Sequence, residues 1–309
     1  MRIATRPTRV GNLDNWDPAL VDDIAAGREV ILLDNSGVGR STGFTPHSVK
    51  GLARDVLAFT DALGLTEIDL FGFSLGGFVA QETVLLRPHL VRRQILAGTG
   101  PEGGRGFHAW SEEIASHAYK DVQGAEDVFY LFFAPTQTSQ AKAKEFAARI
   151  FTRERDRDHK PALAVRDAQA EAITGWGIPD MGKLARLAGI TQPTLVASGS
   201  NDILVPTVNS YLLAGHIPDA RLIIYPDAGH GFLFQCPHEF AAEVNKFLGA
   251  ARDPDGAHTP AALHPPRDDP PRIYAEPSLQ DRRARKTQYI CSPRPEVRHV
   301  FTPASVPPG

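Results

Sequence analysis

The motif G-F-S-L-G, centred on Ser74, could place a serine nucleophile. It lies between an apolar run, Ile68–Phe73, and helix-forming sequence, Phe78–Leu86. A G-x-S-x-G motif between a strand and a helix is typical of a nucleophile elbow. The turn is so tight that the positions two before and two after the serine need glycine, which Gly72 and Gly76 supply. We therefore expect Ser74 Oγ to be exposed at the carboxyl end of the strand. The alternative is an incidental glycine-rich turn.

A serine hydroxyl becomes a good nucleophile only when a base takes its proton, so the motif requires a histidine and an orienting carboxylate. The chain offers both after later strands. Asp202 follows the apolar run Thr194–Gly199, and His230 follows the run Ala220–Tyr225. Because the carboxyl ends of parallel strands meet at one edge of a sheet, we expect Ser74, Asp202 and His230 to converge there.

These two assignments have simpler alternatives. Asp202 could instead cap a helix that starts near Val205, because aspartate is common at that position. Asp227 is a rival acid, but it lies close to His230 in sequence and is expected to shape that turn. His230 itself could be a surface residue, although its place after a strand and between two glycines favours a base. Three other histidines are expected to be structural or solvated: His89, His216 and His238.

The elements that would position these residues alternate between strand and helix. Strands are expected at 29–33, 68–73, 92–97, 194–199 and 220–225, and the apolar run at 68–73 is typical of a parallel sheet covered on both faces. Helical patterns or composition occur at 15–26, 49–63, 78–86, 206–216 and 237–248. This alternation predicts a mostly parallel α/β sheet with helices on both faces.

Between Pro101 and Gln192 the alternation stops. Four successive helices are expected there, at 111–120, 125–133, 139–152 and 161–176. Aromatic residues gather in this insert, including Trp110, Phe132 and Trp176. Most should form its core, and a minority should line a cleft over Ser74, because pockets for small ligands are mainly apolar and aromatic.

Three further motifs accompany the elbow: L-D-N-S-G-V-G-R-S at 33–41, G-S-N-D-x-x-V-P at 199–206 and A-G-H-G-F at 228–232. With them the chain resembles the α/β-hydrolase superfamily from about Gly11 to Ala250. Within it the chain is similar to the cap-bearing serine esterases and the cofactor-free haloperoxidases. A serine at the elbow argues against the dehalogenases and epoxide hydrolases of this fold, which have aspartate there. The resemblance implies a hydrolase core at 11–100 and 193–250 and a helical cap at 101–192.

The expected activity is hydrolysis of a small carboxylic ester through an acyl-enzyme, with Ser74 as nucleophile, His230 as base and Asp202 as its orienting acid. The backbone N–H of Leu75, at the start of the elbow helix, is expected to donate to the oxyanion. Two alternatives stay open: perhydrolysis of a carboxylic acid on the same triad, and a catalytically idle binding protein.

Composition and motifs argue against several other classes. A net charge of −3 gives no electrostatic case for nucleic acid or an anionic membrane. We find no signal peptide or membrane span, and two distant cysteines favour a reducing, cytoplasmic setting. The glycine loop at 37–43 has its last glycine one residue late for a dinucleotide motif, and Thr45-Pro46 follows where a helix should open. No metal motif occurs, so we expect no cofactor and no metal.

After about Ala250 the composition changes. Residues 251–309 hold about half of the chain's 25 prolines, several as doublets, and the basic cluster 282–286. Such a segment has too little apolar surface to offset its ordering entropy, so we expect a disordered tail. Peptide binding through its prolines is the alternative.

The N-terminus departs from the family pattern, in which further strands precede the helix at 15–26. The last of them lies between the strands at Val30 and Ile68 and ends in a loop that supplies a second oxyanion N–H. Matching puts Thr8 where that loop has histidine, with Arg9 or Val10 at the donor position. Because residues 1–10 hold three arginines and a proline, they are expected to make a poor central strand. The expectation is an N-terminally truncated or altered hydrolase, with an incomplete oxyanion hole, weak activity and poor folding.

Overall fold

A computed structural model describes residues 2–5, 12–152, 155, 157–159 and 162–250, with residues 2–5 described by their backbone alone. The chain divides into two units, Met1–Arg252 and Asp253–Gly309, and every described residue lies in the first. The tail expected at 251–309 therefore lies outside the described residues.

Six parallel strands form one sheet in the order β2-β1-β3-β4-β5-β6. Their bounds are β1 Arg2–Thr5, β2 Val30–Leu33, β3 Ile68–Phe73, β4 Val91–Ala97, β5 Thr194–Gly199 and β6 Ala220–Tyr225. Each crossover between strands passes through helical sequence, as parallel pairing requires. The sheet confirms the predicted mostly parallel α/β fold.

The structure corrects the expectation of a missing central strand. β1 lies between β2 and β3, with Ile3 opposite Ile31 on one side and opposite Leu70 on the other. β1 comprises Arg2–Thr5, a stretch without proline. The prediction judged all ten N-terminal residues together, whereas four without proline are enough to pair both neighbours. The donor positions expected at Thr8, Arg9 and Val10 lie outside the described residues.

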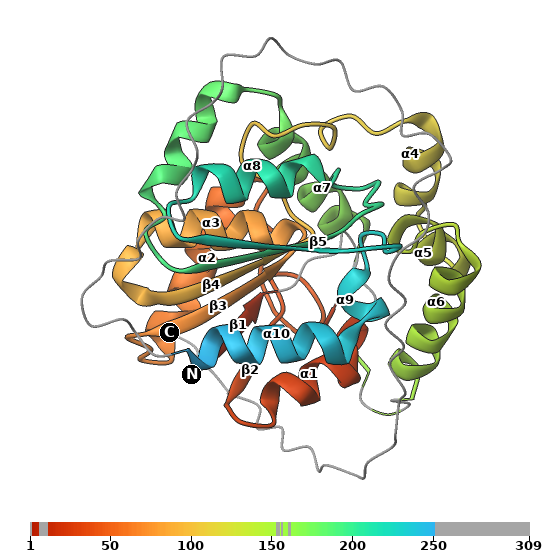
Figure 1. Cartoon of the computed structure of the whole chain (residues 1–309), viewed down its shortest axis with the longest axis horizontal. Helices are drawn as coiled ribbons and strands as arrows, with labels where there is room; N and C mark the ends of the chain where they lie inside the picture. The colour runs from red at the N-terminus through yellow and green to blue at the C-terminus, as the bar shows by residue number, and fades with distance from the viewer. Residues whose placement is uncertain (1, 6–11, 153–154, 156, 160–161, 251–309) are drawn as a thin grey trace, which may run out of the picture. The chain divides into compact units, whose positions relative to one another are not determined.

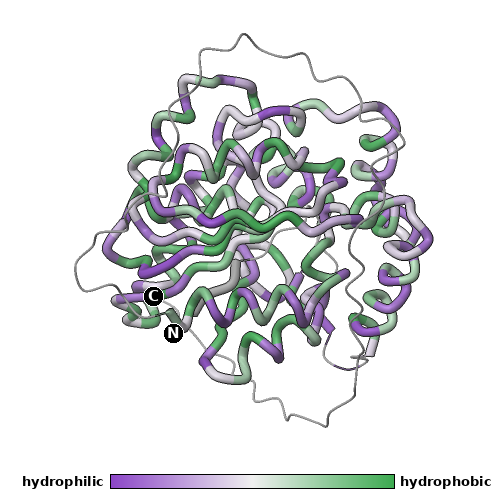
Figure 2. Tube along the Cα trace, viewed as in Figure 1, coloured by the Kyte–Doolittle hydropathy of each residue, from purple (hydrophilic) through white to green (hydrophobic). Residues whose placement is uncertain are grey.

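Helices cover both faces of the sheet (Figure 1). α1 (Pro18–Ala25) and α10 (Pro237–Gly249) contact each other on one face. α2 (Val49–Ala62), α3 (Leu75–Leu86) and α8 (Val208–His216) lie on the other. Apolar residues are concentrated along the central strands (Figure 2), which fits burial of the sheet on both sides.

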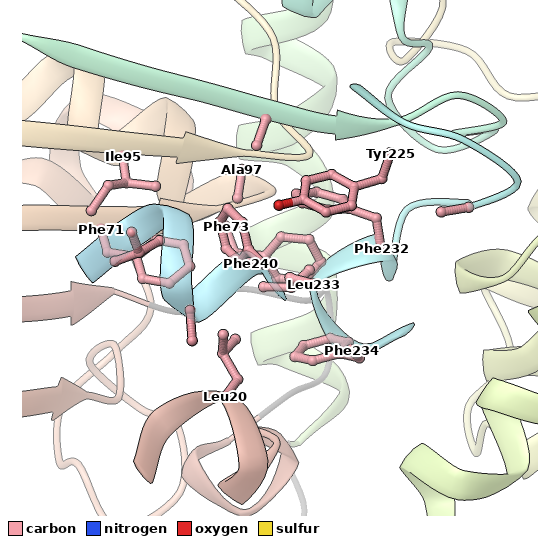
Figure 3. Close-up of a cluster of buried hydrophobic side chains, with 14 of the residues drawn as sticks. Leu20, Phe71, Phe73, Ile95, Ala97, Tyr225, Phe232, Leu233, Phe234 and Phe240 are labelled. Atoms are coloured by element: carbon pink, nitrogen blue, oxygen red, sulfur yellow. The ribbon is translucent and has the colours of Figure 1, made fainter. Parts of the chain in front are cut away.

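Successive residues of a strand point to opposite faces, and this separates two cores. Phe71 and Phe73 pack on the side of α1 and α10, whereas Ile68 and Leu70 pack on the side of α3 and α8. The first core is strongly aromatic: Phe73 lies beside Phe234 of α9 (Phe232–Gln235), with ring centroids 5.5 Å apart (Figure 3). Edge-to-face aromatic pairs of this kind stabilise a core beyond the area they bury.

The chain between β4 and β5 is helical, with α4 (Glu112–Ala118), α5 (Ala125–Phe132), α6 (Gln137–Ile150), α7 (Leu163–Gly177) and the 3-10 segment η3 (Met181–Gly189). We call residues 101–192 the insert. Arg149, in the last turn of α6, ties it to the sheet layer: the guanidinium donates to the buried carboxylate of Asp17 and to Phe234 O. Two short 3-10 segments, η1 (Leu13–Asn15) and η2 (Pro88–Leu90), complete the described elements.

Two helix starts differ from the sequence prediction. The elbow helix begins at Leu75 rather than Phe78. The prediction left out Gly76 and Gly77 because glycine is a poor helix former, but the turn places both residues in the first turn of α3. The first helix begins at Pro18 rather than Asn15, because Asp17 caps it by accepting from the N–H of Ala19.

Candidate active site

Ser74 occupies a strained turn between β3 and α3. Its φ of 56° and ψ of −122° are unusual for a residue with a side chain. Hydrogen bonds hold this conformation: Ser74 N donates to Ala97 O, and Ser74 O accepts from Gly77 N and from Thr99 Oγ1. Strain of this kind persists only where the surroundings enforce it, and it is common at functional sites. The turn presents a half-buried serine side chain at the carboxyl end of β3.

Gly72, two residues before the serine, is required for a steric reason. A Cβ built on Gly72 would lie 2.2 Å from Gly76 O. No real Cβ contact is that short, so any side chain at position 72 would push β3 and α3 apart. The local sequence therefore determines the turn, as the G-x-S-x-G interpretation requires.

Asp202 and His230 are joined by a hydrogen bond of 2.8 Å between Asp202 Oδ2 and His230 Nδ1. Asp202 follows β5 and His230 follows β6, so the two strands place both residues at the edge of the sheet where Ser74 lies. The other carboxylate oxygen, Oδ1, accepts from the N–H groups of Leu204 and Val205, each at 2.9 Å. Asp202 therefore does not cap a helix, because α8 begins at Val208 with Thr207 before it; Oδ1 instead holds a turn, while Oδ2 bonds His230.

The His230 ring is enclosed by aromatic residues. Its side chain is 1% exposed, with its centroid 4.9 Å from the ring of Phe73 and 5.3 Å from that of Phe132. Nε2, the nitrogen not bonded to Asp202, is buried and has no hydrogen-bond partner among the described residues. A neutral imidazole oriented through Nδ1 offers this nitrogen as a proton acceptor.

Asp227 does not compete for the histidine. Its Oδ2 accepts from Thr136 Oγ1 at 3.1 Å, and its backbone N–H donates to Ser200 Oγ. Its φ of 55° makes it the second non-glycine residue with positive φ among the described residues, after Ser74. Asp227 therefore shapes the turn before His230, the alternative that the sequence favoured for it.

Ser74 and His230 line the same cavity, whose volume is about 40 Å³. A single water needs roughly 10–15 Å³ on the same measure, so the cavity has room for a short chain of atoms. From the sheet layer and its loops it is lined by Ser74, Phe78, Leu204, Val205 and His230. From the insert it is lined by Trp110, Ala118, Gln123, Leu131, Phe132 and Ile173. The insert thus supplies one wall of the cavity over Ser74.

Leu75 begins α3 directly after the serine. The first N–H groups of a helix have no acceptor within the helix, and the helix dipole places positive charge there. The backbone N–H of Leu75 is one of these groups.

Sequence reasoning did not find the contact between the insert and the histidine loop. Gly231 N donates to Phe132 O at 2.6 Å, and a Cβ on Gly229 would lie 2.6 Å from the same oxygen. The end of α5 therefore packs directly on the backbone that flanks His230. The two glycines around His230 were the signal, because glycine permits such a close approach of two backbones.

Within the described part of the chain, no group of three or more His, Cys, Asp or Glu side chains has the arrangement of a metal site. In the same part, no helix combines the length and apolar character needed to cross a bilayer.

Comparison with known proteins defines the class. The pattern of the alpha/beta hydrolase fold family matches residues 7–237, so the chain belongs to that family. The match confirms the resemblance inferred from the elbow and its companion motifs, and the relatives described next support a hydrolase.

A candidate carbamate hydrolase, RutD, from Pseudomonas savastanoi pv. phaseolicola is 29% identical over 244 residues, which cover 74% of this chain and 88% of that protein. A candidate non-heme bromoperoxidase, BpoC, from Mycobacterium tuberculosis is 25% identical over 251 residues, covering 77% and 89%. The solved structure of an alpha/beta hydrolase fold protein from Chitinophaga pinensis is 35% identical, with a TM-score of 0.76, and the match covers 81% and 90%.

Proposed function

We propose that this protein is a serine hydrolase that cleaves small carboxylic esters through an acyl-enzyme intermediate. The observation that carries the proposal is the bonding of His230. Nδ1 is bonded to Asp202, and Nε2 is buried and has no partner in the described part of the chain, beside the cavity that Ser74 lines. In a serine hydrolase this nitrogen takes the proton of the nucleophile.

The proposed first step transfers the Ser74 hydroxyl proton to His230 Nε2 while Oγ attacks the ester carbonyl. Asp202 stabilises the imidazolium that forms, and the Leu75 N–H donates to the oxyanion. When the tetrahedral intermediate collapses, the bond to the alcohol oxygen breaks and the alcohol leaves with the proton from His230. Water then attacks the acyl-enzyme by the same route and releases a carboxylic acid.

The cavity favours a short acyl group. Its volume is about 40 Å³, and apart from Ser74, His230 and Gln123 its described lining is apolar or aromatic. We assign this space to the acyl group, because that group stays on Ser74 while the alcohol departs and water enters. Longer chains would have to displace the wall formed by Leu131, Phe132 and Ile173.

Labelling with a fluorophosphonate tests the proposal, because this reagent reacts with an activated serine. The protein should be labelled at Ser74, and Ser74→Ala should abolish labelling without lowering the thermal midpoint. Turnover of p-nitrophenyl esters from acetate to octanoate should fall as the chain lengthens, and aryl carbamates should be compared beside them. Absence of labelling in the folded protein would favour the idle binding protein.

Perhydrolysis is the second candidate, favoured by the relative named as a bromoperoxidase. On the same triad, a carboxylic acid would acylate Ser74 with loss of water, and hydrogen peroxide would then release a peracid that oxidises bromide. Bromination that depends on both acetate and peroxide, and disappears in Ser74→Ala, would establish this activity. Ester hydrolysis without such bromination would exclude it.

A further inference from the structure

Among the described insert residues that line the cavity over Ser74, Gln123 is the one with an amide side chain. It lies in the turn between α4 and α5 and is half-buried. Trp110, the lining residue with an indole N–H, donates that group to Leu204 O at 2.9 Å. Apart from Ser74 and His230, Gln123 is thus the described lining residue whose side chain can still form a polar contact.

Hydrogen bonds fix which end of the Gln123 amide is available. Nε2 donates to the backbone oxygen of His117 at 3.1 Å and to that of Ala118 at 3.4 Å. Carbonyl oxygens only accept, so the NH2 group must be on this side, and the two bonds determine the amide orientation. Oε1 has no hydrogen-bond partner among the described residues. The amide therefore offers an acceptor.

The turn that carries Gln123 is held at both ends by Asp127. Its Oδ1 accepts from Lys120 Nζ at 2.5 Å and bonds His117 Nδ1 at 2.7 Å, while Oδ2 accepts from Gly124 N at 2.9 Å. The imidazole of His117 also stacks on the ring of Tyr130, with centroids 4.3 Å apart. These contacts pre-organise the turn, so that a ligand would not have to order the amide on binding.

We propose that Gln123 is a specificity-determining residue that selects acyl groups bearing a hydroxyl, which would donate to Oε1. This inference rests on the proposed ester hydrolysis. Gln123 lines this mainly apolar cavity, and Oε1 is the amide atom left for a contact with a bound ligand. If an aliphatic chain displaces the water bonded to that acceptor, a hydroxyl on the chain restores one bond. The substrate class is therefore esters of short hydroxycarboxylic acids rather than of plain aliphatic acids.

The test compares p-nitrophenyl butyrate with its 2-hydroxy and 3-hydroxy analogues on the wild-type protein and on Gln123→Met. Methionine has the length and flexibility of glutamine but no amide acceptor. We expect kcat/KM for at least one hydroxylated ester to fall about three- to tenfold in the variant, the range of one hydrogen bond. The value for butyrate should not fall, because methionine removes the acceptor that an aliphatic chain would leave unpaired. Val122→Ala, at a neighbouring side chain that is 72% exposed, is the matched control and should change neither.

The ratio of the two substrates separates recognition from structural damage, because a loosened turn would slow both esters equally. An unchanged ratio in Gln123→Met, with fluorophosphonate labelling of Ser74 intact, would overturn the inference and leave the proposed hydrolase standing. A measurement without turnover completes the test: Ser74→Ala should bind methyl 3-hydroxybutyrate or methyl 2-hydroxybutyrate several-fold more tightly than methyl butyrate in ligand-observed NMR titrations. Introducing Gln123→Met into the Ser74→Ala variant should remove that difference. Equal affinities of Ser74→Ala itself for the hydroxylated and plain esters would also overturn the inference.

Discussion

Asp202 serves two parts of the site with its two oxygens. Oδ2 accepts from His230 Nδ1, and Oδ1 accepts from the N–H groups of Leu204 and Val205. The carboxylate thus orients the proposed base while it also holds the loop whose residues 204 and 205 line the cavity. Stability and the proposed catalysis both depend on this residue, and substitutions can separate them.

Asp202→Asn should preserve the conformation of the Leu204–Val205 loop but greatly reduce the proposed activity. The asparagine carbonyl can still accept from Leu204 N and Val205 N, whereas its NH2 group, facing Nδ1, would favour the wrong imidazole tautomer. We expect kcat to fall by about 10⁴ with little change in the thermal midpoint. Asp202→Ala should lose both, because the two buried N–H groups would each cost about 1–3 kcal/mol without an acceptor. Equal destabilisation of the two variants in urea titrations would contradict the division of roles.

Gly229→Ala should destabilise the protein and loosen the contact between α5 and the histidine loop. The added Cβ would lie 2.6 Å from Phe132 O, so one of the two backbones must move, at a cost of about 1–3 kcal/mol. Gly215→Ala in α8 is the matched control, because no atom of the described residues lies within 4 Å of its Cβ position. It should stabilise the protein by about 0.5–1 kcal/mol. Chemical denaturation measures both, and a neutral Gly229→Ala would refute the close contact.

Asp127 should make the α4–α5 turn sensitive to acid. Burial raises the pKa of Asp127, but bonds from Lys120, Gly124 N and His117 outweigh it and lower the pKa to about 2. The unfolded chain has an ordinary pKa near about 3.9, so the contribution to stability is complete above that pH and is lost as pH falls toward about 2. Asp127→Asn should reduce the loss of stability between about pH 4 and pH 2. Parallel pH dependence in both proteins would show that other groups cause it.

Ile3→Pro should disrupt the centre of the sheet. β1 has a partner strand on each side, so a lost N–H at position 3 removes a ladder bond whichever neighbour it serves. We expect a loss of roughly 3 kcal/mol in unfolding free energy. Ile3→Val, which keeps a β-branched side chain, should be close to neutral. A proline variant as stable as the wild type would mean that Arg2–Thr5 does not occupy this position in solution.

Much of the fold and of the candidate site could be predicted from the sequence, because both depend on short local patterns. Buried parallel strands produce mainly apolar runs such as Ile68–Phe73, in which Asp69 is the one charged residue. The elbow needs glycine at position 72 because a Cβ there would meet Gly76 O, a reason confined to five residues. Asp202 and His230 could be placed because each directly follows a strand whose end is at the same edge of the sheet.

The tertiary structure alone decided three features, because each depends on residues far apart in the chain. β1 is too short to produce a pattern of its own, and its strand conformation follows from the two neighbours that need partners. Gln123 became a candidate only because the insert places it in the same cavity as Ser74, although the two residues are 49 positions apart in the sequence. The two roles of Asp202, at His230 and at the Leu204–Val205 loop, became visible only from the direction in which each carboxylate oxygen points. Sequence determines which groups follow which strands, whereas the orientation of a side chain is set by the packing of everything around it.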